Sequence, residues 1–247
     1  MSKSQKQRLD QLLVDRGLVE NKSRAQAIVM AGLVSSNSIK LEKPGQHVKI
    51  NISLNVKGAD HPWVSRGGVK LAHGLEFFKI NPKNKVALDI GASTGGFSDV
   101  LLNGAAKKIF AVDVGYGQLA WKISQDERVT ILDKTNARYL SREQVPDYID
   151  LIVCDASFIG LEVILPAAMS LTARKACVVA LIKPQFEVGR ENVGRGGIVQ
   201  DENLHNSVIN RLQSWIGSQK GWSVLGVTES PLKGKNGNKE FLIAAEK

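Results

Sequence analysis

The sequence predicts an α/β domain with a mostly parallel sheet, preceded by a small α+β module. From Lys85 onward, short apolar runs alternate with helical stretches, which is typical of β–α–β units around a buried parallel sheet. The first part of the chain instead carries two short helical patterns followed by short strand-like runs. Between them lies a segment punctuated by proline and glycine, residues 59–68.

The N-terminal part shows a helix–helix–hairpin pattern. Residues 8–16 predict a first helix, with Gly17 as its C-cap. Ser23 is the expected N-cap of a second helix over residues 24–31, which Gly32 ends. The inward positions should be Leu9, Leu12 and Leu13 in the first helix and Ala27, Ile28 and Ala31 in the second. Short strands are expected at 33–34, 39–41 and 48–52.

The second part predicts seven strands. A helix from about Val69 precedes them, with Lys70 at its start. Strands are expected at 86–90, 109–114, 129–132, 151–154, 176–182, 223–227 and 241–245. Helices are expected near 96–104, 117–124, 160–173 and 202–217. No helix separates the last two strands, so they should form a hairpin that places one antiparallel strand in the sheet.

Charge is unevenly distributed along the chain. The net charge is +9, and residues 1–58 hold ten Lys/Arg against four Asp/Glu, which leaves +3 for the remainder. A localised basic block favours a polyanionic partner, although an ordinary solvated surface would carry the same charges. The start of the chain is polar and lacks the apolar core of a signal peptide, and no apolar run is long enough for a membrane span. We therefore expect a cytoplasmic protein with no membrane partner.

The two cysteines, Cys154 and Cys177, lie inside apolar runs and are expected to be reduced core residues. Neither belongs to a Cys/His cluster, so no metal site is expected. The sequence does not indicate an oligomeric state.

Polar and glycine residues follow the strands of the second part. Because ligands of open parallel sheets bind beyond the carboxyl ends of the strands, these residues are candidates for a binding site. A glycine-rich loop follows the first strand, and Asp113 at the next strand end could accept both hydroxyls of a ribose. Together they favour a nucleoside ligand over a purely structural turn. The candidate ligand-binding residues are Asp89, Gly91, Ala92, Ser93, Thr94, Gly95, Phe97, Asp113, Val114, Asn136, Ala137 and Asp155.

Other ligands fit the loop less well. No lysine of a phosphate-binding loop follows the glycines, and the GxGxxG pattern of dinucleotide sites is absent. The loop also matches the G-x-S-x-G nucleophile elbow of hydrolases, but a triad would need a later histidine. Only His205 follows, and a hydrolase would leave Asp113 and Lys183 without a role.

The N-terminal part resembles the S4 RNA-binding domain. The matching segments are Arg8-Leu9-Asp10-Gln11-Leu12-Leu13, Gly17-Leu18, Ser23-Arg24-Ala25-Gln26-Ala27-Ile28 and Ala31-Gly32-Leu33-Val34. The resemblance implies RNA-phosphate contacts from Arg8, Lys22 and Arg24, and Arg66 is a further candidate. A bare helical hairpin with solvated charges is the alternative.

The whole chain resembles the TlyA family of S4-containing ribosomal RNA 2′-O-methyltransferases, some of which are called hemolysins. The segments that carry the likeness are Trp63 to Leu71, Asp89 to Phe97, Asp155-Ala156-Ser157-Phe158 and Lys183-Pro184-Gln185-Phe186-Glu187. Ser93-Thr94 stand where related FtsJ (RrmJ) enzymes often have proline. The resemblance implies a Rossmann-like class I methyltransferase fold with a seven-stranded sheet, S-adenosylmethionine as cofactor, and ribosomal RNA or a ribosomal subunit, with cytidine as the target. We expect an RNA-binding domain at 1–58, a linker at 59–68 and a catalytic domain at 69–247.

The resemblance also implies a catalytic tetrad of Lys70, Asp155, Lys183 and Glu240. A ribose hydroxyl must lose its proton as it attacks a methyl group, and a lysine can accept that proton only when it is neutral. Lys183 is the candidate base, and Lys70 would be the neighbouring cation that lowers its pKa. Asp155 and Glu240 would orient the lysines and the hydroxyl.

Three alternatives remain open. The first is a noncatalytic RNA-binding protein with the same fold. Such a protein would not need the four tetrad residues, and this chain has all of them. A secreted hemolysin would need a signal peptide or a membrane segment. An amino-group methyltransferase often carries Asp/Asn-Pro-Pro-Tyr/Phe where this chain has Asp155-Ala156-Ser157-Phe158.

Overall fold

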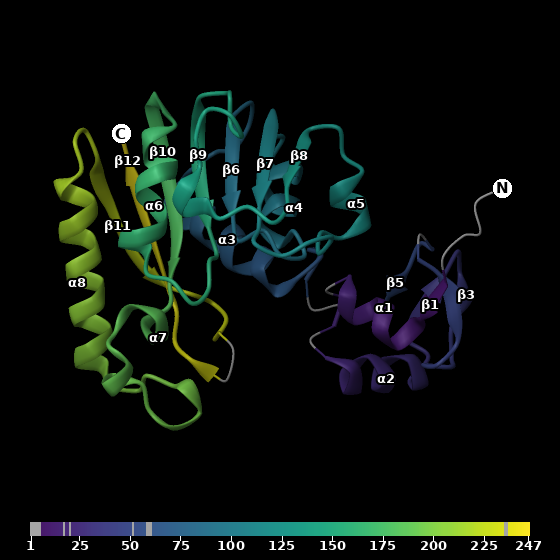
Figure 1. Ribbon diagram of the computed structural model, residues 1–247. Helices are drawn as coiled ribbons and strands as arrows, with labels where there is room; N and C mark the ends of the chain where they lie inside the picture. Colours follow the sequence, from purple (N-terminus) through teal and green to yellow (C-terminus); the bar gives the residue numbers. More distant parts are fainter. Residues whose placement is uncertain (1–5, 17, 20, 51, 58–60, 235–236) are drawn as a thin grey trace.

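The computed structural model describes residues 6–16, 18–19, 21–50, 52–57, 61–234 and 237–247. The chain forms a small N-terminal module, residues 6–57, beside a larger α/β domain (Figure 1). In the part of the chain that the structure describes, no helix is both long enough and apolar enough to cross a bilayer.

The N-terminal module packs two helices against two small sheets. Helix α1 (Leu9–Asp15) contacts α2 (Lys22–Met30), and their core includes the fully buried Leu9, Leu13 and Val29. Strand β2 (Val34–Ser36) pairs with β3 (Ile39–Lys40) and β5 (Asn55–Val56), and β1 (Lys6–Arg8) pairs with β4 (His47–Lys49). The predicted helices and hairpin are present, whereas β1 was not predicted.

Two details of α2 differ from the prediction. Its N-cap is Asn21, not Ser23, because the Asn21 side chain accepts a hydrogen bond from the backbone N–H of Arg24. The helix buries Ala25, Ile28 and Val29, and Ala27 and Ala31 are exposed instead of inward. Gly32 does end the helix, with a left-handed φ of 67°. The predicted cap Gly17 lies outside the described residues.

The larger domain contains the predicted seven-stranded sheet, in the order β11-β12-β10-β9-β6-β7-β8. Its strands are β6 (Val86–Ile90), β7 (Lys108–Val112), β8 (Val129–Leu132), β9 (Ile149–Cys154), β10 (Thr172–Ile182), β11 (Ser223–Glu229) and β12 (Phe241–Glu246). Strand β12 runs antiparallel between β11 and β10, and the pairs from β10 to β8 are parallel. This confirms the mostly parallel sheet with one antiparallel strand.

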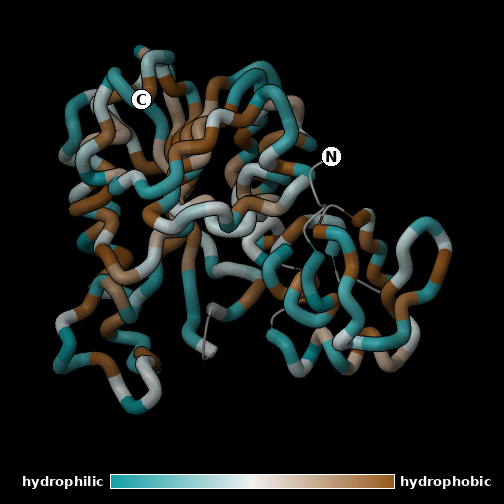
Figure 2. Tube along the Cα trace, turned by 45° about the vertical axis from the view of Figure 1, so that its right-hand side comes forward, coloured by the Kyte–Doolittle hydropathy of each residue, from teal (hydrophilic) through white to brown (hydrophobic). Residues whose placement is uncertain are grey.

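Helices cover both faces of the sheet (Figure 1). On one face, α3 (Arg66–Phe77) and α4 (Gly96–Asn103) bury Leu71 and Leu101. On the other, α6 (Leu161–Ser170) and α8 (Glu202–Ser218) bury Leu165 and Leu212. Figure 2 shows the hydrophobic residues gathered along the central strands between these layers. The short helices α5 (Trp121–Ser124), α7 (Pro184–Glu187), η1 (Ala137–Tyr139), η2 (Arg190–Asn192) and η3 (Arg195–Gly197) lie in the connections.

Helix α3 begins at Arg66, three residues before the predicted start. The glycines at its beginning suggested a linker, but they form the first turn because neighbours come very close. A Cβ on Gly68 would lie 2.4 Å from the Trp63 side chain, and one on Gly67 would lie 3.5 Å from an Asp155 carboxylate oxygen. Residues 66–68 are therefore packed against the edge of the sheet to which Asp155 belongs.

Candidate active site

The glycine loop after β6 has a backbone that other residues would strain. Gly91 has a φ of 78°, and a Cβ there would lie 3.0 Å from backbone atoms of Asp155 and Ala156. Gly95 has a φ of 89° and is the N-cap of α4. The loop thus turns tightly against the end of β9, with the first N–H groups of α4 at its far side.

The Asp113 carboxylate joins this loop to the next strand end. Its Oδ2 accepts a hydrogen bond from the backbone N–H of Ser93 at 2.8 Å, and its Oδ1 accepts one from Gly115 at 2.7 Å. Each carboxylate oxygen can accept more than one hydrogen bond, so the half-buried Asp113 keeps acceptor capacity for a ligand.

Asp89 lies beneath the loop. It is fully buried, and its Oδ2 accepts a hydrogen bond from the Ser98 hydroxyl of α4 at 2.7 Å. Burial raises the pKa of this carboxyl to about 7, and the nearby carboxylates of Asp155 and Asp113 add to the rise. Its position under α4 indicates that it supports the loop from behind.

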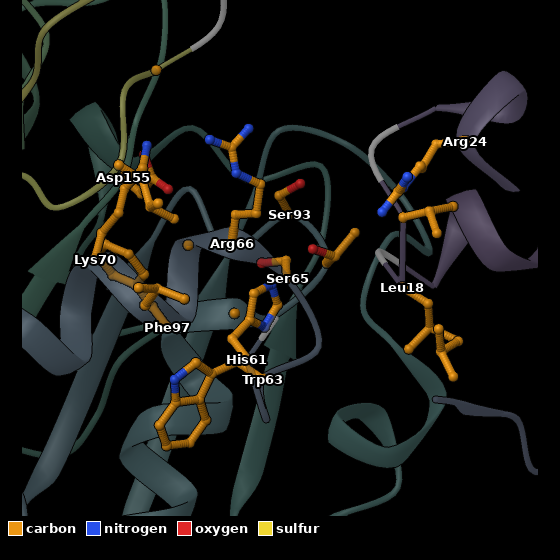
Figure 3. A pocket seen from close by; sticks show the side chains of 18 of the residues that line it. Leu18, Arg24, His61, Trp63, Ser65, Arg66, Lys70, Ser93, Phe97 and Asp155 are labelled. Carbon is orange, nitrogen blue, oxygen red and sulfur yellow. The ribbon is translucent and has the colours of Figure 1, made fainter. Parts of the chain in front are cut away.

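A cavity of about 1310 Å³ opens in front of the loop and extends to the N-terminal module (Figure 3). Of the predicted ligand-binding residues, those that line it are Gly91, Ala92, Ser93, Thr94, Phe97 and Asp155. The others surround the same edge of the sheet without lining this cavity: Asp89, Gly95, Asp113, Val114, Asn136 and Ala137. The Asn136 side chain caps η1 by accepting from the Arg138 N–H.

The four predicted tetrad residues form two ion pairs. Lys70 of α3 contacts Glu240, which precedes β12, at 2.5 Å, and Lys183, which follows β10, contacts Asp155, which follows β9, at 2.6 Å. Lys70, Lys183 and Glu240 are buried, whereas Asp155 is half-buried. Lys70 and Asp155 both line the cavity. Four separate segments therefore bring these side chains to the edge of the sheet that carries the glycine loop.

Lys183 has three oxygen neighbours. Besides the Asp155 carboxylate, Nζ donates to the Ser157 hydroxyl at 2.9 Å and to the Asp155 carbonyl at 3.1 Å. Lys70, predicted as the neighbouring cation, is paired with Glu240, one of the two carboxylates expected to orient the lysines.

The predicted RNA-binding arginines differ in their surroundings. Arg24 of α2 and Arg66 of α3 line the cavity from opposite sides (Figure 3), and Arg66 donates to the Lys233 carbonyl. Lys22 is exposed on α2. Arg8 forms a 2.6 Å ion pair with the buried Asp10, and that contact holds the pKa of the Asp10 carboxyl well below its usual range.

Two polar residues at the site were not singled out from the sequence. Ser157 contacts Lys183, and Glu187 accepts a hydrogen bond from the backbone N–H of Leu161. Both lie inside tetrapeptide or pentapeptide motifs that the sequence did single out. Because both residues come shortly after a strand, the sequence could have indicated them as candidates. Their hydrogen-bond partners become visible only in the folded structure.

Both cysteines are free, and Cys177 is half-buried instead of lying in the core as predicted. Cys154 is fully buried, and burial raises the pKa of its thiol to about 12, which makes it an unreactive core residue. Within the described ranges, no group of three or more His, Cys, Asp or Glu side chains is arranged to hold a metal ion.

Comparisons with known proteins agree with this arrangement. Residues 63–247 match the FtsJ-like methyltransferase family, and residues 7–51 match the S4 domain. The chain is 45% identical to YqxC of Bacillus subtilis, described as a candidate rRNA methyltransferase, over 97% of this chain and 85% of that protein. It is 43% identical to the 16S/23S rRNA (cytidine-2′-O)-methyltransferase TlyA of Mycobacterium tuberculosis, over 96% of this chain and 88% of that protein.

A solved structure of a candidate hemolysin from Streptococcus thermophilus has a similar fold and sequence. It superposes with a TM-score of 0.78 at 41% identity and covers 99% of this chain and 90% of that one. Fold, glycine loop and family match together define an S-adenosylmethionine-dependent methyltransferase with an FtsJ-like catalytic domain. With its N-terminal S4 domain, the chain belongs to the TlyA family of RNA methyltransferases.

Proposed function

We propose that the protein transfers the methyl group of S-adenosylmethionine to the ribose 2′-hydroxyl of a cytidine in ribosomal RNA. The observation that carries this proposal is that two ion pairs, Lys70–Glu240 and Lys183–Asp155, each bring one member to the cavity that the glycine loop lines. Ribosomal RNA and cytidine are proposed because the Mycobacterium tuberculosis relative is named for that substrate.

The residues present fit S-adenosylmethionine. The tight turn at Gly91, the loop from Ala92 to Thr94 that lines the cavity and the Asp113 carboxylate together suit a nucleoside with an amino acid attached. When bound, the cofactor supplies a methyl group on a positively charged sulfur. Asp113 would accept hydrogen bonds from its ribose hydroxyls, and Asn136 and Ala137 would lie beside its base.

The chain's own residues would then position the hydroxyl and take its proton. Nζ of Lys183 would take the proton of the 2′-hydroxyl as that oxygen attacks the methyl group. Lys183 must be neutral to accept that proton. Asp155 would hold Nζ toward the cavity, and the Lys70–Glu240 pair would orient the hydroxyl.

The N-terminal module would hold the RNA. Arg24 and Arg66 face the cavity from two sides, and Lys22 adds charge on α2. Arg8 would contact a phosphate only with the part of its guanidinium that Asp10 leaves accessible. We propose that residues 1–58 form the RNA-binding domain and residues 69–247 the catalytic domain, joined by 59–68, and that the protein acts in the cytoplasm on a ribosomal subunit.

A labelling experiment tests the proposal. Purified small and large ribosomal subunits are incubated with the protein and S-adenosylmethionine that carries a tritiated methyl group, and the RNA is digested to nucleosides. We expect label in 2′-O-methylcytidine, and label that appears at least about 100-fold more slowly with the Lys183→Ala variant. Label in a base-methylated nucleoside, or no transfer to either subunit, would contradict the proposal.

A further inference from the structure

Glu187 ends the Lys183-Pro184-Gln185-Phe186-Glu187 segment and is not explained by the proposed chemistry. Its side chain is only 3% exposed. Its Oε1 accepts a hydrogen bond from the backbone N–H of Leu161 at 2.8 Å, and its Oε2 contacts Arg211 of α8 at 2.8 Å. The carboxylate also lies close to Gly160, where a Cβ would be 3.2 Å from Oε2.

These contacts connect the two segments that carry the Lys183–Asp155 pair. Leu161 is the first residue of α6 and ends the loop that begins at Asp155. Glu187 is the last residue of α7, the short helix that directly follows Lys183. The two segments therefore meet twice, once where Lys183 contacts Asp155 and Ser157, and again where Glu187 contacts Leu161.

An aromatic contact also joins these two segments. The rings of Phe158 and Phe186 lie 4.9 Å apart, between the Lys183 contacts and the Glu187 contact. Phe158 has a φ of 67°, a left-handed conformation that is uncommon for a bulky non-glycine residue. The loop from Asp155 to Leu161 therefore includes one unusual backbone position.

A buried carboxylate at this place is costly unless its contacts compensate it. Burial raises the pKa of Glu187, while the Leu161 N–H and Arg211 act in the opposite direction. The N–H that Glu187 accepts belongs to the first turn of α6, which has no partner within its own helix. The Glu187 side chain thus accepts a hydrogen bond from the N-terminal end of α6, although it belongs to another segment. The side chain must be long enough to reach the Leu161 N–H.

We propose that Glu187 is a positioning residue that holds the loop carrying Asp155 in register with Lys183 for proton transfer. The inference rests on the proposed function, since it concerns the geometry of that site. This role depends on the hydrogen bond that Glu187 accepts from Leu161. The length of the side chain therefore matters more than its negative charge. Glu187 itself does not touch the reacting atoms.

Two substitutions separate reach from charge. Glu187→Gln keeps the side-chain length and an acceptor oxygen for Leu161 but loses the charge, whereas Glu187→Asp keeps the charge and is one methylene shorter. Glu162→Gln is the matched control, because Glu162 also pairs with Arg211, at 2.5 Å, without accepting from Leu161. Single-turnover methyl transfer, the RNA concentration at half-maximal rate and the Kd for S-adenosylmethionine are measured for each.

We expect Glu187→Asp to lower the transfer rate by about 10- to 100-fold, the loss typical of a misplaced reacting group. Glu187→Gln and Glu162→Gln should stay within about threefold of the unmodified protein, because each keeps the hydrogen bond to Leu161 and leaves Arg211 one glutamate partner. RNA and cofactor affinity should be unchanged in all three. A destabilised core variant, Val208→Ala, should keep its rate even if its Tm falls as far as that of Glu187→Asp.

Three results would overturn the proposal: an unchanged rate in Glu187→Asp, an equal loss in Glu187→Gln, or a similar loss in Val208→Ala at matched Tm. Failure of the proposed function is distinguishable, because the unmodified protein itself would then transfer no methyl group to ribose.

Discussion

Asp113 allows a quantitative test of the cofactor site. Its two oxygens accept hydrogen bonds from Ser93 at 2.8 Å and Gly115 at 2.7 Å, so Asp113→Ala removes two contacts that order the loops, as well as the proposed acceptor for ribose hydroxyls. A hydrogen bond to a charged group contributes about 1.5–3 kcal/mol. Loss of one such contact to the ligand weakens binding by about 10- to 160-fold, and the disordered loops should add to that loss.

Isothermal titration calorimetry with S-adenosylmethionine measures this effect. Asp113→Asn should lose less affinity than Asp113→Ala, because its amide oxygen can still accept one backbone hydrogen bond. Asp133→Asn is the control: Asp133 accepts from Gly117 in the neighbouring loop but is not a proposed ligand contact, so its Kd should change little. Unchanged affinity in a folded Asp113→Ala protein would remove Asp113 from the cofactor site.

Two further predictions concern RNA binding and pH. Removal of residues 1–58 should leave S-adenosylmethionine binding measurable by calorimetry and sharply reduce RNA affinity, and RNA binding by the full chain should weaken steeply with salt in filter-binding assays; strong, salt-insensitive binding by the shortened protein would refute the assignment. Asp89 has a pKa of about 7 when folded and near 4 when unfolded, so the native state binds the extra proton between these values. The free energy of unfolding should therefore fall as pH rises from 4 to 7, and denaturant titrations should show less of this fall in Asp89→Asn; identical pH profiles would contradict the raised pKa.

Much of the fold could be predicted because its signals are local. The central strands β6, β7 and β9 are short apolar runs, since strands covered on both faces are buried almost throughout. Parallel strands end at the same edge, so the residues after them, including Asp155 and Lys183, could be grouped in advance.

Features that depend on tertiary contacts were not predictable. Strand β1 is Lys6-Gln7-Arg8, which has no apolar alternation, and it forms because it pairs with β4. Asn21 and Ser23 both suit an N-cap, and only the path of the chain decides between them. Arg66-Gly67-Gly68 looked like a linker because glycine usually ends helices, yet close packing places it in α3.

The residues of the tetrad could be named in advance, but the side chains that they contact could not. The family resemblance indicated Lys70, Asp155, Lys183 and Glu240, and only Asp155 and Lys183 directly follow strands; in the structure the four form two ion pairs. The pairing of Lys70 with Glu240, and the three oxygens around Lys183, follow from how α3 and the β9 and β10 loops pack. For this reason the direction of any effect of Lys70 on Lys183 could not be obtained from the sequence.

The most direct test of the account is the rate of methyl transfer by Lys183 variants in a single turnover at saturating RNA and cofactor. Lys183→Ala should bind both ligands and lose about 10²- to 10⁴-fold in rate, the usual contribution of positioned proton transfer. Lys183→Arg should not recover the rate, because a guanidinium keeps its proton and cannot act as a base at neutral pH. An arginine variant that transfers methyl groups at nearly the unmodified rate would contradict a base at Lys183 and would leave it a role in charge or positioning only.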